Sequence, residues 1–448
     1  MRSSIDISAE VPARTGYMVV VLAAAYTFSF MDRQILGLMI GPIRQDLGIS
    51  DVEVSLLQGL AFALLFGLGS LPAGRLADRG NRSVLIAIGI CFWSLMTVAC
   101  GFARSFGGLF IARAGVGIGE SVLSPAAYSM LADAYSPRDL PRAMAGFMMG
   151  GIVGAGLGFV VGGLVVSYVS QGTTLYLPIL GELKSWQAVF VLIGLPGLMV
   201  SALALTLREP TRRGLLKDVR DGRVSSLSTG GVLRHVMGRW QGYVPLTLGA
   251  AALSVLGYGY LGWFPTYLIR DHGVSPGSAG VVLGVEYLCV GPLGALGGVR
   301  FARYMQGRGY VDGNLRAVAI MASAFVPLSL GTLASNATVA FIAAAPVIFL
   351  LSAYIGVVAA SLQLVTPNQM RALVSALFQM TINVLGLSIG PTIVAATTQH
   401  VFQNDLAVGK SLVISVAGAG LISTCLLTLA LPAYRRMLAE SSSWSSSK

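Results

Sequence analysis

The sequence predicts an all-α membrane protein with twelve transmembrane helices in two pseudo-symmetric six-helix bundles. Three observations support this prediction. Of the 448 residues, 55% are hydrophobic and only 11% are charged, whereas soluble domains carry about 25% charged residues. Apolar stretches of about 20 residues, the length that crosses a bilayer, recur along the whole chain. Finally, a sequence pattern in the first half returns in the second half.

The apolar stretches predict the spans in order. The first stretch begins at Tyr17 and contains Asp32 and Arg33. It is too long for a signal peptide, so we expect it to remain in the mature protein. All four cysteines fall inside spans, which favours packing roles over an extracellular disulfide framework. The predicted spans cover residues 17–42, 53–75, 83–103, 107–131, 142–168, 186–207, 242–268, 277–299, 314–335, 338–364, 370–398 and 410–433.

The distribution of charge predicts the orientation in the membrane. The chain has 30 Lys and Arg residues, 19 Asp and Glu residues and a net charge of +11. In a soluble chain this excess would favour nucleic acid as a partner. Here most of the basic residues fall in alternate loops and in the two tails, as expected for the cytoplasmic side of a membrane protein. We therefore expect no nucleic-acid partner, and we predict that both termini are cytoplasmic.

One long polar stretch, Arg208 to Trp240, divides the spans six from six. We predict a first bundle over residues 1–207, a cytoplasmic basic linker over 208–240, and a second bundle with a cytoplasmic tail over 241–448. The linker carries eight basic and three acidic residues. The simpler interpretation is that these charges fix the topology. The alternative is that the linker lies against anionic lipid headgroups.

The two halves also share a pattern. LADAYSPRDLPRAMAGF, between the fourth and fifth spans, resembles LQLVTPNQMRALVSALF between the tenth and eleventh. Arg142 then corresponds to Arg371. Internal repeats are typical of secondary transporters, in which two bundles move about a midplane site. A channel or a membrane enzyme does not require such a duplication.

Four motifs together resemble a known family. GRLADRGNR (74–82) resembles the signature loop of the major facilitator superfamily, and MDRQ (31–34), RAGVGIGESVLSPAAYSML (from 113) and LREPTRRG (from 207) resemble its spinster-type subfamily. The resemblance covers nearly the whole chain and is to a bacterial spinster homologue. It implies the superfamily fold, alternating access and a place in the bacterial inner membrane. Animal members of the subfamily move sphingosine-1-phosphate and lysophospholipids.

The resemblance also implies a cytoplasmic gate. Asp78 would face the helix that starts near Arg371, where the dipole of a helix N-terminus favours an anion. This contact would close the cytoplasmic side, and a solvated turn is the alternative interpretation. The copy of the loop in the second half has Ala302 in the place of Asp78, so we expect only the first loop to act in this way. The full set of gate candidates is Gly74, Asp78, Arg79, Arg82, Arg142 and Arg371.

Two acids and two arginines lie within the first and fourth predicted spans. Asp32 and Arg33 are adjacent in the first span and do not face each other, so each needs a partner elsewhere. Arg113 and Glu120 lie two helical turns apart on one face of the fourth span, at overlapping depth. We predict that the four residues line a cavity, since ionisable groups inside a membrane are functional by default. The alternatives are a purely structural ion-pair network, and arginines that hold an anionic headgroup.

The second half offers a different set of side chains. Aromatic residues cluster in the seventh span and two amides lie one turn apart in the eleventh. A cavity with one charged wall and one aromatic or amide wall suits an amphiphile. For the aromatic residues, a belt at the membrane interface is the alternative. The cavity candidates are Tyr258, Tyr260, Trp263, Phe264, Glu286, Gln379 and Asn383.

Two matches to catalytic or nucleotide-binding motifs are rejected. GLSIG (386–390) and GYGYLG (257–262) lie within apolar helices and lack the strand that each motif requires. Both indicate close packing of small residues, as does the stripe Gly150, Gly154, Gly158 and Gly162. We expect no enzyme activity, no cofactor and no metal site.

The sequence therefore predicts a secondary active transporter, expected to act as a monomer. Its predicted substrate is an amphiphilic lipid-like solute of the lysophospholipid or sphingoid phosphate type, moved by alternating access. Proton coupling is a hypothesis based on Asp32 and Glu120. A transporter of small organic anions is the nearest alternative, and a membrane-bound lipid hydrolase or sensor is an alternative from another class.

Overall fold

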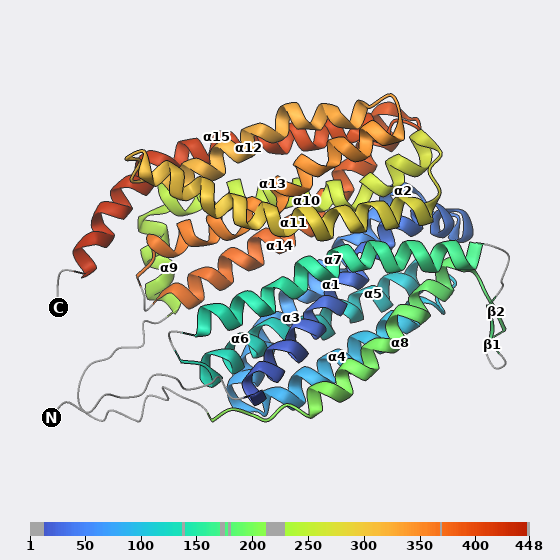
Figure 1. Ribbon diagram of the computed structural model, residues 1–448, viewed down its shortest axis with the longest axis horizontal. Coiled ribbons are helices and arrows are strands. Elements are labelled where there is room, and N and C mark those ends of the chain that lie inside the picture. The colour runs from blue at the N-terminus through green and yellow to red at the C-terminus, as the bar shows by residue number, and fades with distance from the viewer. Residues whose placement is uncertain are drawn as a thin grey trace.

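The structure is a computed structural model that describes residues 13–136, 139–170, 175–177, 181–211, 229–367 and 370–445. Within the described residues, twelve helices or helix pairs are long and apolar enough to cross a membrane. They run side by side along the longest axis of the molecule (Figure 1). The predicted fold of twelve transmembrane helices is confirmed.

Two of the six spans in the first half are broken. A break at Gly59 divides the second span, and a break at Ser121–Val122 divides the fourth. The helices are α1 (Ala13–Leu47), α2 (Asp51–Gln58), α3 (Leu60–Arg79), α4 (Arg82–Cys100), α5 (Phe106–Glu120), α6 (Leu123–Ala134), α7 (Leu140–Ser170) and α8 (Ser185–Leu205).

A short hairpin that was not predicted from the sequence lies between α7 and α8. It consists of β1 (Leu175–Leu177) and β2 (Gly181–Leu183), which pair antiparallel. It projects beyond the helices at one end of the molecule (Figure 1). Apart from this hairpin, the regular structure of the described residues is helical. We call this end the outer end and the opposite end the inner end, following the orientation predicted from the charges.

The second half begins with a short helix that was also not predicted, α9, inside the predicted linker. The spans that follow are helical over almost their whole length. The helices are α9 (Thr229–Gly238), α10 (Trp240–His272), α11 (Pro276–Gly307), α12 (Gly313–Ser329), α13 (Ala337–Leu364), α14 (Arg371–Ala396) and α15 (Val408–Ser445). A 3-10 turn (Leu330–Leu333) extends α12, and a π turn (Thr397–Phe402) extends α14.

Capping side chains explain where several helices begin. In each case a side-chain oxygen accepts a hydrogen bond from the backbone N–H three residues later, which satisfies a donor that the helix leaves free. At α2 the cap is reciprocal, because the Glu53 carboxylate also accepts from the backbone N–H of Ser50. The capping residues are Ser50, Asn81, Ser105, Ser275 and Asn336.

The glycine stripe of α7 brings α1 into close contact. A Cβ added to Gly158 would lie 2.8 Å from the Met31 carbonyl oxygen, and one on Gly154 would meet the backbone of Thr27. The Thr27 hydroxyl also donates to the carbonyl oxygen of Gly150 across the same contact, at 3.1 Å. Small residues permit this approach inside a membrane. The stripe therefore packs helices as predicted, and it fixes the position of α1, which carries Asp32 and Arg33.

Candidate functional site

The four charged residues of the first half lie together as two ion pairs between α1 and α5. Arg113 Nη1 donates to Asp32 Oδ2 at 2.7 Å. Arg33 donates to Glu120 Oε2 through Nε at 3.0 Å and through Nη2 at 2.5 Å. Each acid is thus neutralised by an arginine from the other helix, which lowers the free energy of burying all four groups. Their role in transport stays a prediction.

Hydroxyl groups complete these pairs. Ser29 Oγ donates to Glu120 Oε2 at 2.6 Å, and Thr97 Oγ1 donates to Asp32 Oδ1 at 3.3 Å. The other carboxylate oxygen of Glu120, Oε1, is buried with no hydrogen-bond partner among the described residues, so it can still accept a hydrogen bond or a proton. The side chains of Asp32 and Arg113 are 4% and 1% exposed, whereas that of Arg33 is 10% exposed. Arg33 is therefore the more accessible of the two guanidinium groups.

The aromatic residues around Arg33 were not predicted from the sequence. The guanidinium carbon lies 4.8 Å from the centre of the Phe30 ring, 4.5 Å from that of Phe62 and 5.3 Å from that of Phe66. Such contacts stabilise a cation through the quadrupole of the ring. Phe62 and Phe66 stack one turn apart on α3, and this i, i+4 pair was the available signal in the sequence.

Tyrosines from both halves extend this region. Tyr258 of α10 packs against the hydrophobic cluster of the first half that contains Phe62, and it lies near Arg33. Tyr258 also interacts with Tyr287 of α11 and Tyr354 of α13. In the first half, Tyr26 lies near Arg33 and Glu120, and Tyr128 lies near Tyr26. Of these five tyrosines, the sequence analysis named only Tyr258.

The other aromatic candidates of α10 lie in the packed interior. Tyr260, Trp263 and Phe264 are at most 2% exposed. Trp263 Nε1 donates to the carbonyl oxygen of Pro391 at 2.9 Å, and the Tyr260 and Phe264 rings stack 4.7 Å apart. The structure therefore places them neither at the lipid-facing surface, as the belt alternative requires, nor in open space. Their role as substrate contacts stays a prediction for another conformation.

Glu286 and the two amides lie in less closed surroundings. Glu286 is half-buried on α11, and its Oε2 atom is buried with no hydrogen-bond partner among the described residues. It lies within electrostatic range of Tyr260. On α14, Gln379 is exposed and Asn383 is half-buried. Among the described residues, no contact joins these three residues to the ion pairs.

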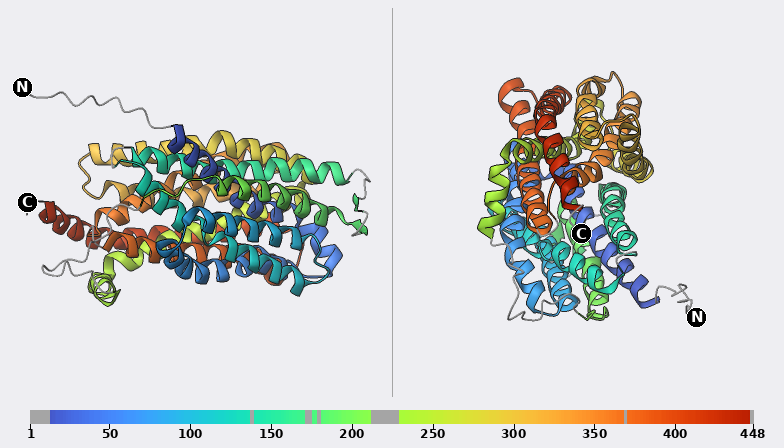
Figure 2. Two further views of the ribbon diagram at one scale, coloured as in Figure 1. Left: turned by 90° about the horizontal axis from the view of Figure 1, so that it is seen from below. Right: turned by 90° about the vertical axis from the view of Figure 1, so that its left-hand side faces the viewer.

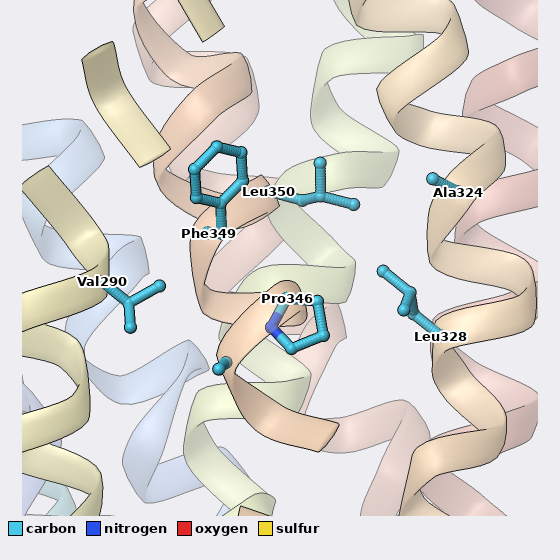
Figure 3. Close-up of a pocket in the computed structure, with 7 residues that line it drawn as sticks. Val290, Ala324, Leu328, Pro346, Phe349 and Leu350 are labelled. Atoms are coloured by element: carbon cyan, nitrogen blue, oxygen red, sulfur yellow. The ribbon is translucent and has the colours of Figure 1, made fainter. Parts of the chain in front are cut away.

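One cavity in the second half is lined by none of these residues. It has a volume of 460 Å³ and is lined by side chains of α11, α12 and α13 (Figure 3). Every lining residue is apolar, so the cavity offers no group that could hold a charged head. The lining residues are Val290, Ala324, Leu328, Ala345, Pro346, Phe349 and Leu350.

Contacts between the two halves close the outer end. Asp51, at the start of α2, accepts two hydrogen bonds from Arg270 at the end of α10, at 2.7 and 2.8 Å. A second ion pair joins Arg44 of α1 to Asp405, at 2.5 Å. Beyond Asp51, three more residues of α2 donate hydrogen bonds to the second half. These are Val52 N to Gln399 Oε1, Ser55 Oγ to Thr392 Oγ1, and Gln58 Nε2 to the Gly262 carbonyl oxygen.

The gate candidates at the inner end are more open. Arg142 and Arg371 are exposed, and a Cβ on Gly74 would meet no atom within 4 Å. Arg371 Nε donates to the Thr366 carbonyl oxygen within its own half, at 3.1 Å. The side chains of Asp78 and Arg79 lie outside the described residues, so the predicted acidic contact stays a prediction.

Arg82 is the exception among the gate candidates, because it is 1% exposed. It pairs with Asp133 of α6 at 2.5 Å and with Glu209, which follows α8, at 2.6 Å. It also donates to Ser129 Oγ and to the Pro210 carbonyl oxygen. These contacts join α4 and α6 to the segment after α8. Glu209 therefore contacts the first bundle, although we assigned it to the linker from the sequence.

The outer contacts lead to a test. Asp51 is 2% exposed, so Asp51→Asn should weaken closure of the outer end by about 1.5–3 kcal/mol, the value of a hydrogen bond to a charged group. Cysteines placed at Ser55 and Thr392, whose oxygen atoms lie 3.3 Å apart, would report closure as disulfide yield. We expect Asp51→Asn to lower that yield.

The matched control is Asp405→Asn. Asp405 is 55% exposed, and exposed ion pairs contribute about 0–1 kcal/mol. Equal yields in the two variants would contradict the assignment of Asp51 as the main outer contact.

The two rejected motifs pack against each other. A Cβ on Gly390, in GLSIG, would lie 2.8 Å from the backbone nitrogen of Gly259, in GYGYLG. Gly386 likewise contacts Ser254. Both segments are helical, in α14 and α10, so neither has the context of a nucleophile or a dinucleotide site. Among the described residues, no group of three or more His, Cys, Asp or Glu side chains could hold a metal ion.

Comparisons with known proteins support the sequence resemblance. The chain is 27% identical over 445 residues to an MFS-type efflux pump of Mycolicibacterium smegmatis, covering 96% of this chain and 95% of the pump. It is 28% identical over 343 residues to protein spinster homolog 1 of Xenopus tropicalis, covering 72% of this chain and 62% of that protein. The chain thus spans less than two thirds of the length of this animal relative.

A solved structure agrees over nearly the whole chain. It is a bacterial homologue of the human lysosomal transporter Spinster in an inward-facing, unoccupied conformation, with a TM-score of 0.73 and 25% identity. The alignment covers 96% of this chain and 97% of that one. The model of the Major Facilitator Superfamily matches residues 22–391, well over half of the sequence. The chain therefore belongs to the major facilitator superfamily, and it is a multi-pass membrane transporter rather than an enzyme.

Proposed function

We propose that this transporter moves an amphiphilic solute with an anionic head, of the lysophospholipid or sphingoid phosphate type, by proton-coupled alternating access. The observation that carries the proposal is the surroundings of Arg33. Its guanidinium group is partly accessible, and three phenylalanine rings surround it. A guanidinium fork binds a phosphate or carboxylate well, and the aromatic surface suits an apolar chain.

Arg33 is favoured over Arg113 as the headgroup ligand. Arg113 is 1% exposed and is held by Asp32. If Asp32 moved away from Arg113 to admit a substrate, a buried charge would be left without its partner, at a cost of about 3–5 kcal/mol. The Asp32–Arg113 pair therefore orients α1 against α5, and Arg33 is the group that exchanges partners.

Glu120 is the proposed proton carrier. While Glu120 is ionised, it neutralises Arg33, and its negative charge repels an incoming anion. When Glu120 Oε1, which has no described partner, takes up a proton, the carboxyl group becomes neutral and Arg33 can bind the anionic head. Proton and substrate are then bound together, and release of one favours release of the other. Proton and substrate binding are linked because Arg33 pairs either with the Glu120 carboxylate or with the anionic head of the substrate.

The access pathway follows from the arrangement of the two bundles, 1–207 and 241–448. Contacts between the bundles close the outer end, and Arg142 and Arg371 are exposed at the inner end. With both termini cytoplasmic, this arrangement corresponds to an inward-facing state. In the opposite state, Asp78 would approach the start of α14, and the Asp51–Arg270 contact would break.

Competition in proteoliposomes tests the substrate class. Uptake of a labelled lysophospholipid should be inhibited by unlabelled lysolipids and sphingoid phosphates, and not by glycerol phosphate or short carboxylates at equal concentration. A transporter of small organic anions would use the same Arg33 and would show the reverse order. The reverse order would reject the lipid-like substrate and leave the role of Arg33 in place.

A further inference from the structure

The short helix α9 carries an apolar surface that no described residue covers. Leu233 and Met237 lie one turn apart on α9 and are 50% and 63% exposed. Trp240, the first residue of α10, is 54% exposed. We call these three residues the α9 stripe. The opposite side of α9 is packed, because Val232 is 2% exposed and Val236 contacts the hydrophobic core.

The orientation of α9 is that of a helix lying on a membrane surface. It runs across the ends of the spans at the inner end of the molecule rather than along them (Figure 1). Figure 2 shows it at the periphery of the helical bundle, beside the point where α10 begins. A helix here lies at the depth of the headgroups if the spans cross the bilayer. An amphipathic helix in this plane buries its apolar face at the boundary of headgroup and acyl chain.

The charges next to the stripe match an anionic surface. Arg234 is exposed and follows Leu233 directly, about 100° around the helix. Positive charge also dominates the neighbouring sequence, because the stretch from Arg208 to Trp240, which includes Arg234, holds eight basic and three acidic residues. Basic residues near an anionic membrane surface are attracted to it. A Trp at the start of a span is also typical of the membrane interface.

The remaining contacts of α9 are with the second bundle. Arg239, which follows α9, pairs with Glu440 of α15 at 2.9 Å. The His235 ring lies edge-on to Tyr243 of α10. The Tyr243 hydroxyl in turn donates to the carbonyl oxygen of Val365, at the end of α13, at 3.0 Å. These contacts join α9 and the residue after it to α10 and α15 of the second bundle.

We propose that α9 is an interfacial helix that binds anionic phospholipid of the inner leaflet through the α9 stripe and Arg234. It anchors the second bundle to the membrane surface at the point where the two bundles are joined. This inference does not depend on which solute the protein carries.

Fluorescence quenching of the full-length protein in vesicles tests this proposal. A cysteine at Met237, in a variant without Cys91, Cys100, Cys289 and Cys425, carries an environment-sensitive label. The matched control label is at Arg308, which is exposed in the turn between α11 and α12 at the inner end. Nitroxide lipids with the spin label near the headgroup should quench the Met237 label several-fold more than the Arg308 label. Aqueous iodide should show the opposite preference.

Lipid composition tests the role of Arg234. Replacing half of the phosphatidylcholine by phosphatidylglycerol should increase quenching of the Met237 label by nitroxide lipids, and Arg234→Gln should abolish that increase. If Met237→Cys fails to fold, a label at Leu233 gives the same measurement. Equal quenching of both labels by iodide would overturn the proposal and would point to a soluble protein partner instead. No response to phosphatidylglycerol would overturn the requirement for anionic lipid.

Discussion

Replacement of Arg113 by alanine is expected to destabilise the folded protein by about 3–5 kcal/mol. Arg113 and its partner Asp32 are 1% and 4% exposed, and they are joined at 2.7 Å. Without the guanidinium group, the Asp32 carboxylate remains buried with only the hydroxyl of Thr97 as a donor. Removing the partner of a buried charge is one of the most destabilising substitutions in a protein interior. The measurement is equilibrium unfolding of the purified protein in detergent.

A double variant separates charge from packing. Asp32→Asn combined with Arg113→Ala removes both charges, so we expect much of the lost stability to return, leaving mainly the deleted side-chain volume. Asp32→Asn by itself should also destabilise, because it leaves Arg113 without its acid. If Arg113→Ala lowered the free energy of unfolding by less than about 1 kcal/mol, the pair would not be the structural element proposed here.

Replacement of Glu120 by glutamine is expected to abolish the dependence of transport on a pH gradient. Glutamine has nearly the same shape, can still accept the hydrogen bond from Ser29, and remains uncharged at every pH. Arg33 is then always free to bind the anionic head, so substrate binding should be retained while proton coupling is lost. Flux into proteoliposomes, with and without an imposed gradient, measures this directly.

Two further variants test the role of Arg33 and control for effects unrelated to Glu120. Arg33→Gln should weaken substrate binding by roughly 10- to 100-fold, because a hydrogen bond to a charged group contributes about 1.5–3 kcal/mol. Glu440→Gln is the matched control, since Glu440 is 50% exposed near the C-terminal end and pairs with Arg239. It should leave the gradient dependence unchanged. If uptake by the Glu120→Gln variant still followed the gradient, Glu120 would not be the proton carrier.

The architecture of this protein could be predicted almost completely from its sequence. Twelve apolar stretches, the basic linker and the repeated pattern around Arg142 and Arg371 predicted the spans and their division. This succeeds because transfer into a bilayer depends on about 20 consecutive residues, and so it is a local property of the chain. The hairpin between α7 and α8 and the helix α9 were not predicted. Both are short, and a short element contains too few residues to show a clear periodicity.

The candidate site could be predicted in part. Charged residues within apolar spans are easily recognised in a sequence. Asp32 and Arg33 on α1 require charged partners inside the membrane, and Arg113 and Glu120 were the candidates at a similar depth. The i, i+4 spacing of Phe62 and Phe66 places them on one face of a helix, but it does not reveal that Arg33 of another span lies against that face. The buried positions of Tyr260 and Trp263 were also beyond prediction, since a span shows its apolar character on every face.

The sequence alone determined that this chain crosses a membrane twelve times and must bury two acids and two arginines, because both properties depend only on residue type and spacing. The tertiary structure decided how these groups pair. Net charge is zero whether Asp32 pairs with Arg113 or with another arginine, so composition cannot choose between the pairings. The choice depends on the rotation and depth of α1, which its close packing against the glycines of α7 determines. That packing leaves Arg33 as the more accessible of the two arginines.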